Sequence, residues 1–121
     1  MQVLDKELVL FYDEQSYSGK QTLAYAQTIS KAVNKQELSQ SSLSPTIFKI
    51  MLNKLDAKAK DLMNKADADY QSNVRGKDFD EEGWLNVIRK KPNLLKSPVA
   101  MYKGKAVICN TPTDILKLLT H

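Results

Sequence analysis

The chain has 121 residues, of which 42% are hydrophobic and 26% are charged, and its formal net charge is +4 at pH 7. This length suits a single domain, residues 1–121, and no apolar run approaches the ~18 residues that span a membrane. One cysteine, Cys109, excludes an internal disulfide, and one histidine, His121, leaves no His/Cys cluster for a metal. The N-terminus lacks the basic and apolar regions of a signal peptide, so we expect a cytoplasmic protein.

The positive net charge does not by itself indicate a nucleic-acid partner. Basic residues are interleaved with acidic ones, as in residues 56–61, which is typical of a solvated helix face. The densest basic cluster, residues 89–91, falls at the expected C-terminus of a helix, where cations offset the helix dipole. The sequence therefore argues against nucleic acid and against a membrane as partners.

The N-terminal third predicts a strand, a loop and a helix. Residues 8–12 are a continuous apolar run that is too short for a helix and typical of a central strand. Residues 13–19 are polar and contain a glycine, which predicts a loop. Residues 20–33 carry apolar side chains at helical spacing, and a weaker pattern predicts a second strand near residues 37–41.

The middle of the chain predicts helices. Ser44 and Pro45 are a capping residue and a proline at the first helical position, so a helical pair is expected over residues 45–64. Residues 67–77 have no clear period and are expected to be irregular.

A further helix is expected after Asp80, which is placed to cap it. Phe79 precedes the cap and is positioned to pack on Trp84 as a hydrophobic staple. Because proline disfavours helical backbone in the residue before it, the helix is expected to end at Lys91, before Pro92.

The C-terminal quarter predicts a β-hairpin and a last helix. Pro98 cannot donate to a β-ladder and is expected at the start of a strand. A Lys-Gly turn at residues 103–104 leads into a second strand over residues 105–109, and the Thr-Pro-Thr-Asp segment 111–114 begins a helix. The order of elements predicts an α/β layer architecture with helices inserted in the middle.

This order of elements and three C-terminal motifs resemble one family. The motifs are Pro-Asn-Leu-Leu-Lys-Ser-Pro at 92–98, Tyr-Lys-Gly-Lys-Ala at 102–106 and Thr-Pro-Thr-Asp-Ile-Leu-Lys-Leu-Leu at 111–119. They are similar to the glutaredoxin-coupled arsenate reductases (ArsC) and their transcription-regulator relative Spx. The resemblance implies a thioredoxin-like (glutaredoxin-like) fold with a helical insertion, and a cis peptide bond before Pro98.

The resemblance also implies where the family's nucleophile lies. In that family a cysteine in the loop after the first strand forms a thiolate that the following helix stabilises and that attacks arsenate. This chain has Ser16 there. A serine hydroxyl is un-ionised at neutral pH, and His121, the only histidine, provides no base to activate it.

The arginines that hold the oxyanion in the family are also missing at the positions that the resemblance implies. One position, just before the cis-proline, holds Ser97 with Lys96 beside it. Another, after the last strand, holds Asn110. A third falls near Asn64 and Lys65, neither of which is an arginine.

The candidate site is therefore a vestigial active-site loop with a cleft beside it, without catalytic residues and without a metal. The loop consists of Ser16, Tyr17, Ser18, Gly19 and Lys20, and the cleft of Ser97 and Pro98. Ser18 and Lys20 are more typical of an ordinary solvated helix start than of a catalytic site. The alternative is that the loop amides form a site for a small anion. Cys109 lies in an apolar strand, where we expect it to act as a small buried hydrophobic residue.

Two functions remain open. The first is a non-catalytic ArsC/Spx-like protein that serves as a binding or regulatory module, for a protein, a peptide or a small anion. We expect it to be monomeric and to need no cofactor. The alternative is an arsenate reductase-like or glutathione-linked thiol oxidoreductase, which would use glutathione and would need either a cysteine at position 16 or a reactive Cys109.

Overall fold

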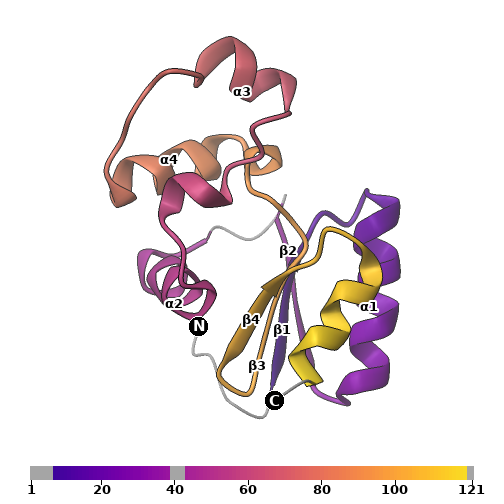
Figure 1. The fold of residues 1–121 in the computed structure, drawn as a ribbon. Helices are drawn as coiled ribbons and strands as arrows, with labels where there is room; N and C mark the ends of the chain where they lie inside the picture. Colours follow the sequence, from indigo (N-terminus) through magenta and orange to yellow (C-terminus); the bar gives the residue numbers. More distant parts are fainter. Residues whose placement is uncertain (1–6, 39–42, 120–121) are drawn as a thin grey trace. The chain divides into compact units, whose positions relative to one another are not determined.

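The computed structural model describes residues 7–38 and 43–119 (Figure 1). The chain divides into two compact units: a sheet unit, residues 1–42 and 97–121, and a helical unit, residues 43–96. The strands and helices of the sheet unit are β1 (Leu8–Tyr12), α1 (Tyr17–Ile29), β2 (Val33–Glu37), β3 (Val99–Tyr102), β4 (Lys105–Ile108) and the 3-10 helix η3 (Pro112–Leu119). The helices of the helical unit are α2 (Pro45–Leu55), η1 (Ala59–Leu62), α3 (Ala68–Asn73), α4 (Glu81–Lys90) and η2 (Pro92–Leu94).

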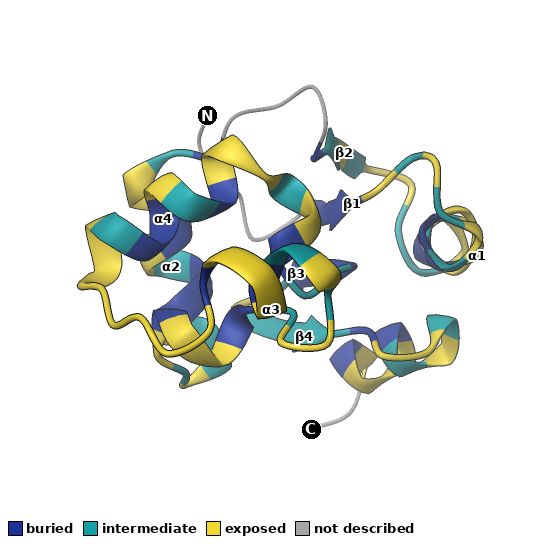
Figure 2. Cartoon of the chain, turned by 90° about the horizontal axis from the view of Figure 1, so that it is seen from above, coloured by how far each residue is buried: buried dark blue, intermediate teal, exposed yellow. Residues whose placement is uncertain are grey.

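The sheet unit is built on a four-stranded mixed sheet in the order β2-β1-β3-β4. Strand β1 runs parallel to β2 and antiparallel to β3, and every one of its residues is buried, as expected for a central strand. Helices α1 and η3 lie side by side over one face of the sheet (Figures 1 and 2). The core between them joins Leu8 and Leu10 of β1 to Ala26 of α1 and Ile115 of η3. The predicted α/β architecture with inserted helices is confirmed.

The C-terminal hairpin forms as the turn residues predict. Lys103 and Gly104 both have positive φ, 49° and 78°, which matches the twist of a two-residue hairpin turn. Strand β4 ends at Ile108, one residue before the predicted end. The amide of Cys109 still donates to the Pro98 carbonyl at 2.8 Å, but Pro98 has no N–H to return a hydrogen bond, so the ladder does not continue. The last helix forms where expected, as a 3-10 helix.

Two helix starts in the helical unit follow their predicted caps. Ser44 Oγ accepts a hydrogen bond from the Ile47 amide at 3.1 Å, and Pro45 is the first residue of α2. At the start of α4, the rings of Phe79 and Trp84 meet edge to face with centroids 5.0 Å apart, which confirms the staple.

The N-terminal part differs from the prediction in three boundaries. Helix α1 begins at Tyr17, inside the predicted loop 13–19, because the Ser16 side chain caps it. The predicted helix over 20–33 ends at Ile29, since the Ala32 carbonyl already accepts from the Leu8 amide and the chain has joined the sheet. Strand β2 is therefore at 33–37 and not at 37–41, of which 39–41 lie outside the described residues.

The predicted irregular segment 67–77 contains the short helix α3. Asp67 caps it by accepting from the Asp69 amide at 2.8 Å, and Tyr70 is buried. Only one residue of this helix is buried, so it has no periodic apolar pattern to detect. Within residues 7–38 and 43–119, no helix is both long and apolar enough to cross a membrane.

Candidate functional site

The sheet register brings the two predicted parts of the site to the same end of the sheet. Phe11, near the end of β1, pairs with Val99 at the start of the antiparallel neighbour β3. The loop after β1 and the segment before β3 therefore leave adjacent strands at the same end. The peptide bond between Ser97 and Pro98 is cis, which confirms the prediction, and Pro98 is buried.

The side chain of Ser16 is the N-cap of α1. Its Oγ accepts a hydrogen bond from the Gly19 amide at 2.8 Å and donates one to the Asp13 carbonyl at 3.1 Å. The Ser16 amide also donates to the Asp13 carbonyl, at 3.0 Å. Because the hydroxyl proton is given to a carbonyl, which is not a base, this geometry caps the helix and does not activate a nucleophile.

The rest of the loop is a tightly closed helix start with exposed side chains. A Cβ at Gly19 would collide with the Asp13 carbonyl oxygen and Ser16 Oγ, so the glycine is needed for this close approach. Tyr17 is 70% exposed, and its hydroxyl accepts from Gln21 Nε2 at 2.8 Å. Lys20 is exposed as well. The loop thus presents an aromatic ring and a cation to solvent.

The electrostatics at this end of the sheet have both signs. The first turn of α1 has no acidic residue, which leaves the positive end of the helix dipole uncompensated within the helix. At the end of β1, burial raises the pKa of Tyr12, and the carboxylates of Glu37 and Glu14 raise it further. The site therefore combines a helix N-terminus with carboxylates around the Tyr12 hydroxyl.

Cys109 is a buried residue, as predicted. Its exposed fraction is 1%, and burial together with the Asp114 carboxylate raises the pKa of the thiol to about 12. Such a thiol is almost wholly protonated at neutral pH and is a poor nucleophile. In the described part of the chain, no three His, Cys, Asp or Glu side chains are placed to hold a metal ion.

The two arginines of the chain bind carbonyl groups within the helical unit. Arg89 Nε donates to the Leu43 carbonyl at 2.9 Å, and Arg75 Nη1 donates to Gln71 Oε1 at 3.3 Å. Asn110, at one of the positions where the family resemblance implies an arginine, is exposed.

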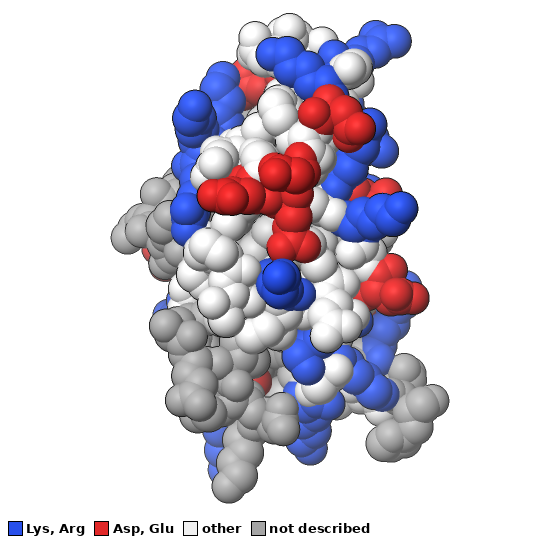
Figure 3. Space-filling view, turned by 90° about the vertical axis from the view of Figure 1, so that its left-hand side faces the viewer, with Lys and Arg blue, Asp and Glu red and all other residues white. Residues whose placement is uncertain are grey.

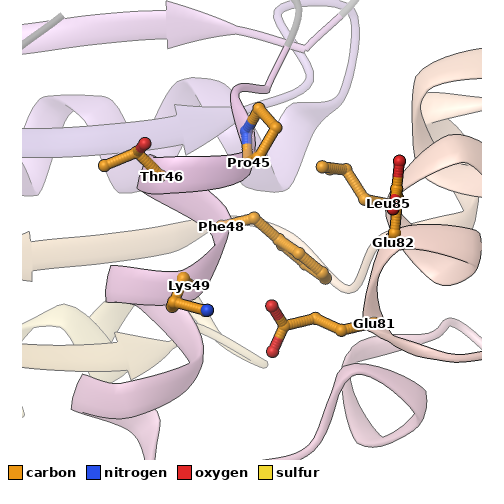
Figure 4. A pocket seen from close by; sticks show the side chains of 7 residues that line it. All are labelled: Pro45, Thr46, Phe48, Lys49, Glu81, Glu82 and Leu85. Carbon is orange, nitrogen blue, oxygen red and sulfur yellow. The ribbon is translucent and has the colours of Figure 1, made fainter.

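The structure also shows a pocket that the sequence reasoning missed. It lies in the helical unit, between the first turns of α2 and α4 (Figure 4). No local pattern in the sequence shows that α2 packs beside the start of α4.

The fold and the site together define a thioredoxin-like α/β protein with a helical insertion, in which a side-chain-capped helix follows the first strand. The model of the ArsC family matches residues 15–118, and the chain belongs to this family.

Solved structures similar to this chain include an arsenate reductase from Vibrio cholerae, with 16% identity, a TM-score of 0.80 and coverage of 94% of this chain and 98% of that one. A Yersinia pestis protein assigned as an arsenate reductase has 20% identity and a TM-score of 0.81, with coverage of 91% and 98%. An arsenate reductase-related protein from Brucella melitensis has 13% identity and a TM-score of 0.56, with coverage of 99% and 100%. These likenesses support the fold. No curated protein matches the chain.

Proposed function

We propose that this chain is a non-catalytic member of the ArsC family, a binding or regulatory module that has lost thiol redox chemistry. The observation that carries the proposal is Ser16. It stands where the family resemblance implies the cysteine nucleophile. Its hydroxyl makes two hydrogen bonds at the start of α1, one to the Asp13 carbonyl and one from the Gly19 amide.

Two further observations support the loss of chemistry. Cys109 is the only thiol of the sequence, and burial raises its pKa to about 12, so it does not replace the missing thiolate. Ser97 and Asn110 stand where the resemblance implies arginines. Neither side chain provides the bidentate donor pair with which a guanidinium group binds an oxyanion.

The binding surface in this proposal is the cleft formed by the loop from Ser16 to Lys20 and the Ser97-Pro98 segment. The amides of Tyr17 and Ser18 precede the first hydrogen bonds of α1 and suit a small anion. The segment before β3 suits an extended peptide, which adds main-chain hydrogen bonds. Glutathione combines both features, since it is a peptide with two carboxylates and an ammonium group. The predicted orientation of the Pro98 ring, toward the Ser16 loop, belongs to this proposal.

An activity assay tests the loss of chemistry. The purified protein, given arsenate, glutathione and glutaredoxin, is expected to give no turnover above a protein-free control. The variant Ser16→Cys is expected to stay nearly inactive, because the arginines are still absent, and Ser18→Cys is its matched control. Turnover that disappears in Cys109→Ala would contradict the proposal and support the thiol oxidoreductase alternative.

A titration followed by amide NMR shifts tests the cleft, with phosphate, sulfate and glutathione as separate probes. Shifts confined to residues 15–21 and 97–99 are expected. The variant Ser18→Pro removes one of the two amides without adding charge, and it is expected to weaken the phosphate response, whereas Gln21→Ala, one turn further along α1, keeps it. No response of these residues at millimolar ligand would refute the cleft.

A further inference from the structure

The pocket of the helical unit is an apolar depression with charges on two sides. Its volume is about 390 Å³, within the ~300–1,000 Å³ that is typical of ligand pockets. Phe48 and Leu85, both almost completely buried, form its floor, and the exposed Pro45 borders it. Figure 4 shows these apolar side chains between the two helices. The floor therefore suits an apolar group.

The two sides of the pocket differ in charge. Lys49 lines it from α2, and Glu81 and Glu82 line it from α4 (Figure 4). All three are exposed, and among the described residues none of them takes part in an ion pair. The charges are thus available to a ligand. The carboxylate side is the stronger one, because two carboxylates line the pocket from α4 and one ammonium group lines it from α2.

This acidic side stands out in a chain whose net charge is +4. Figure 3 shows a face on which several carboxylates gather. A ligand with a cation beside an apolar group finds both partners at the pocket, whereas a ligand with a carboxylate at the same place meets Glu81 and Glu82 and is repelled.

We propose that the pocket between α2 and α4 binds a peptide segment of a partner protein in which an apolar side chain is followed by Lys or Arg. The apolar side chain lies on Phe48 and Leu85, and the cation faces Glu81 and Glu82. This surface belongs to the helical unit and does not depend on the cleft of the sheet unit, so either proposal can fail without the other.

The probe is the capped tetrapeptide acetyl-Gly-Leu-Lys-Gly-amide, titrated into the full chain and followed by amide NMR. Shifts are expected in residues 45–49 and 81–85. Acetyl-Gly-Leu-Glu-Gly-amide is expected to bind at least about threefold more weakly, as is usual for reversing one exposed charge. Acetyl-Gly-Gly-Lys-Gly-amide, which lacks the apolar side chain, is also expected to bind more weakly than the Leu-Lys peptide.

The variant Glu81→Gln/Glu82→Gln is expected to lower the affinity for the Leu-Lys peptide by about threefold to tenfold. Asp78→Asn is its matched control, since it removes a carboxylate of the same run that does not line the pocket. The affinity of this variant for the Leu-Lys peptide is expected to stay within about twofold of that of the parent chain. In Glu81→Lys/Glu82→Lys the preference is expected to reverse toward the Leu-Glu peptide.

Three outcomes would overturn the proposal. They are equal binding of the Leu-Lys and Leu-Glu peptides, a preference that does not reverse in the charge-reversal variant, and the absence of shifts around the pocket. Shifts confined to residues 15–21 and 97–99 would support the cleft and refute the pocket.

Discussion

The starts of α1 and α4 have the same capping hydrogen bond but differ in the charge of the first turn. In each, the capping side chain accepts a hydrogen bond from the amide of a glycine three positions later. Ser16 Oγ accepts from the Gly19 amide and Asp80 Oδ1 accepts from the Gly83 amide, both at 2.8 Å. The first turn of α1 has no acidic residue, whereas that of α4 has Glu81 and Glu82. The capping geometry is therefore the same at the two starts, whereas only the first turn of α4 presents carboxylates to a ligand.

This difference separates the two proposed surfaces. The uncompensated N-terminus of α1 favours an anion, and the carboxylates of α4 both offset their own helix dipole and favour a cation. In the two proposals the same capping hydrogen bond thus stands beside two different kinds of ligand, and the variants below change either the cap or the charge.

The largest expected effect comes from the glycines. Gly19→Ala places a Cβ against the Asp13 carbonyl oxygen, which is part of the backbone and cannot move alone. At Gly83 the new Cβ would meet the movable Asp80 Oδ1 at 3.0 Å and also Phe79 Cβ at 2.9 Å, which is bonded to the backbone and must shift. Alanine itself favours a helix by about 1 kcal/mol, so we expect Gly19→Ala to lower the free energy of unfolding by about 1–3 kcal/mol and Gly83→Ala to lower it by less, because its contacts are less close.

Urea denaturation of both variants measures this difference. Equal losses for Gly19→Ala and Gly83→Ala would mean that the approach to Asp13 is not the reason for a glycine in α1.

The caps themselves come next. Ser16→Ala and Asp80→Ala each leave one amide of the first turn without its acceptor, and each is expected to cost about 1 kcal/mol. Ser16→Asp keeps an acceptor and is the control for the α1 cap. Urea midpoints check the losses, and a Ser16→Ala protein as stable as the parent chain would show that the hydroxyl is not needed for the fold.

These two starts also show what the sequence predicts and what it does not. The start at Asp80 is predicted from a capping residue and a staple, and Phe79 packs on Trp84 as expected. The start at Ser16 is missed, because segment 13–19 is polar and contains a glycine and is therefore predicted to be a loop. Sequence reasoning still placed the candidate loop correctly after β1, since the apolar run of that strand is unambiguous.

Other errors have a tertiary cause. The residues of β2 are mostly polar and half-buried, and it is pairing with the buried β1 that makes them a strand. The pocket with Lys49 and Glu81 results from two helices that are far apart in sequence, and the helix patterns do not say which faces meet. Local side-chain chemistry predicts the helix starts at Ser44 and Asp80 and the turn at residues 103–104, whereas packing between elements decides the course of β2 and the pocket.

A smaller effect is expected from the charges of the first turns. Ser18→Asp adds a carboxylate to α1 and is expected to raise the free energy of unfolding by about 0.3–1 kcal/mol, while Glu81→Gln/Glu82→Gln is expected to lower it by a similar amount. Ser18→Asn and Asp78→Asn are the respective controls. Added salt should reduce both changes, and changes that stay constant in high salt would contradict an electrostatic origin.

The smallest expected effect is at a third helix start, that of η3, where the carboxylate lies inside the turn. Asp114 Oδ2 accepts from the Thr111 amide at 3.0 Å, and Lys117 lies 3.3 Å from the other oxygen. The Thr111 hydrogen bond above all, and then Lys117, hold the pKa of Asp114 below its ordinary value of 3.8. Because the folded pKa is lowered, the stabilisation is present above the ordinary pKa and is lost as the pH falls through the folded one.

Asp114→Asn keeps a neutral acceptor but removes this dependence on pH. The difference in urea midpoint between the parent chain and the variant is therefore expected to be largest near neutral pH and to shrink below about pH 4. A difference for Asp114→Asn that is constant from neutral to acidic pH would mean that shape, and not charge, makes this carboxylate useful at the start of η3.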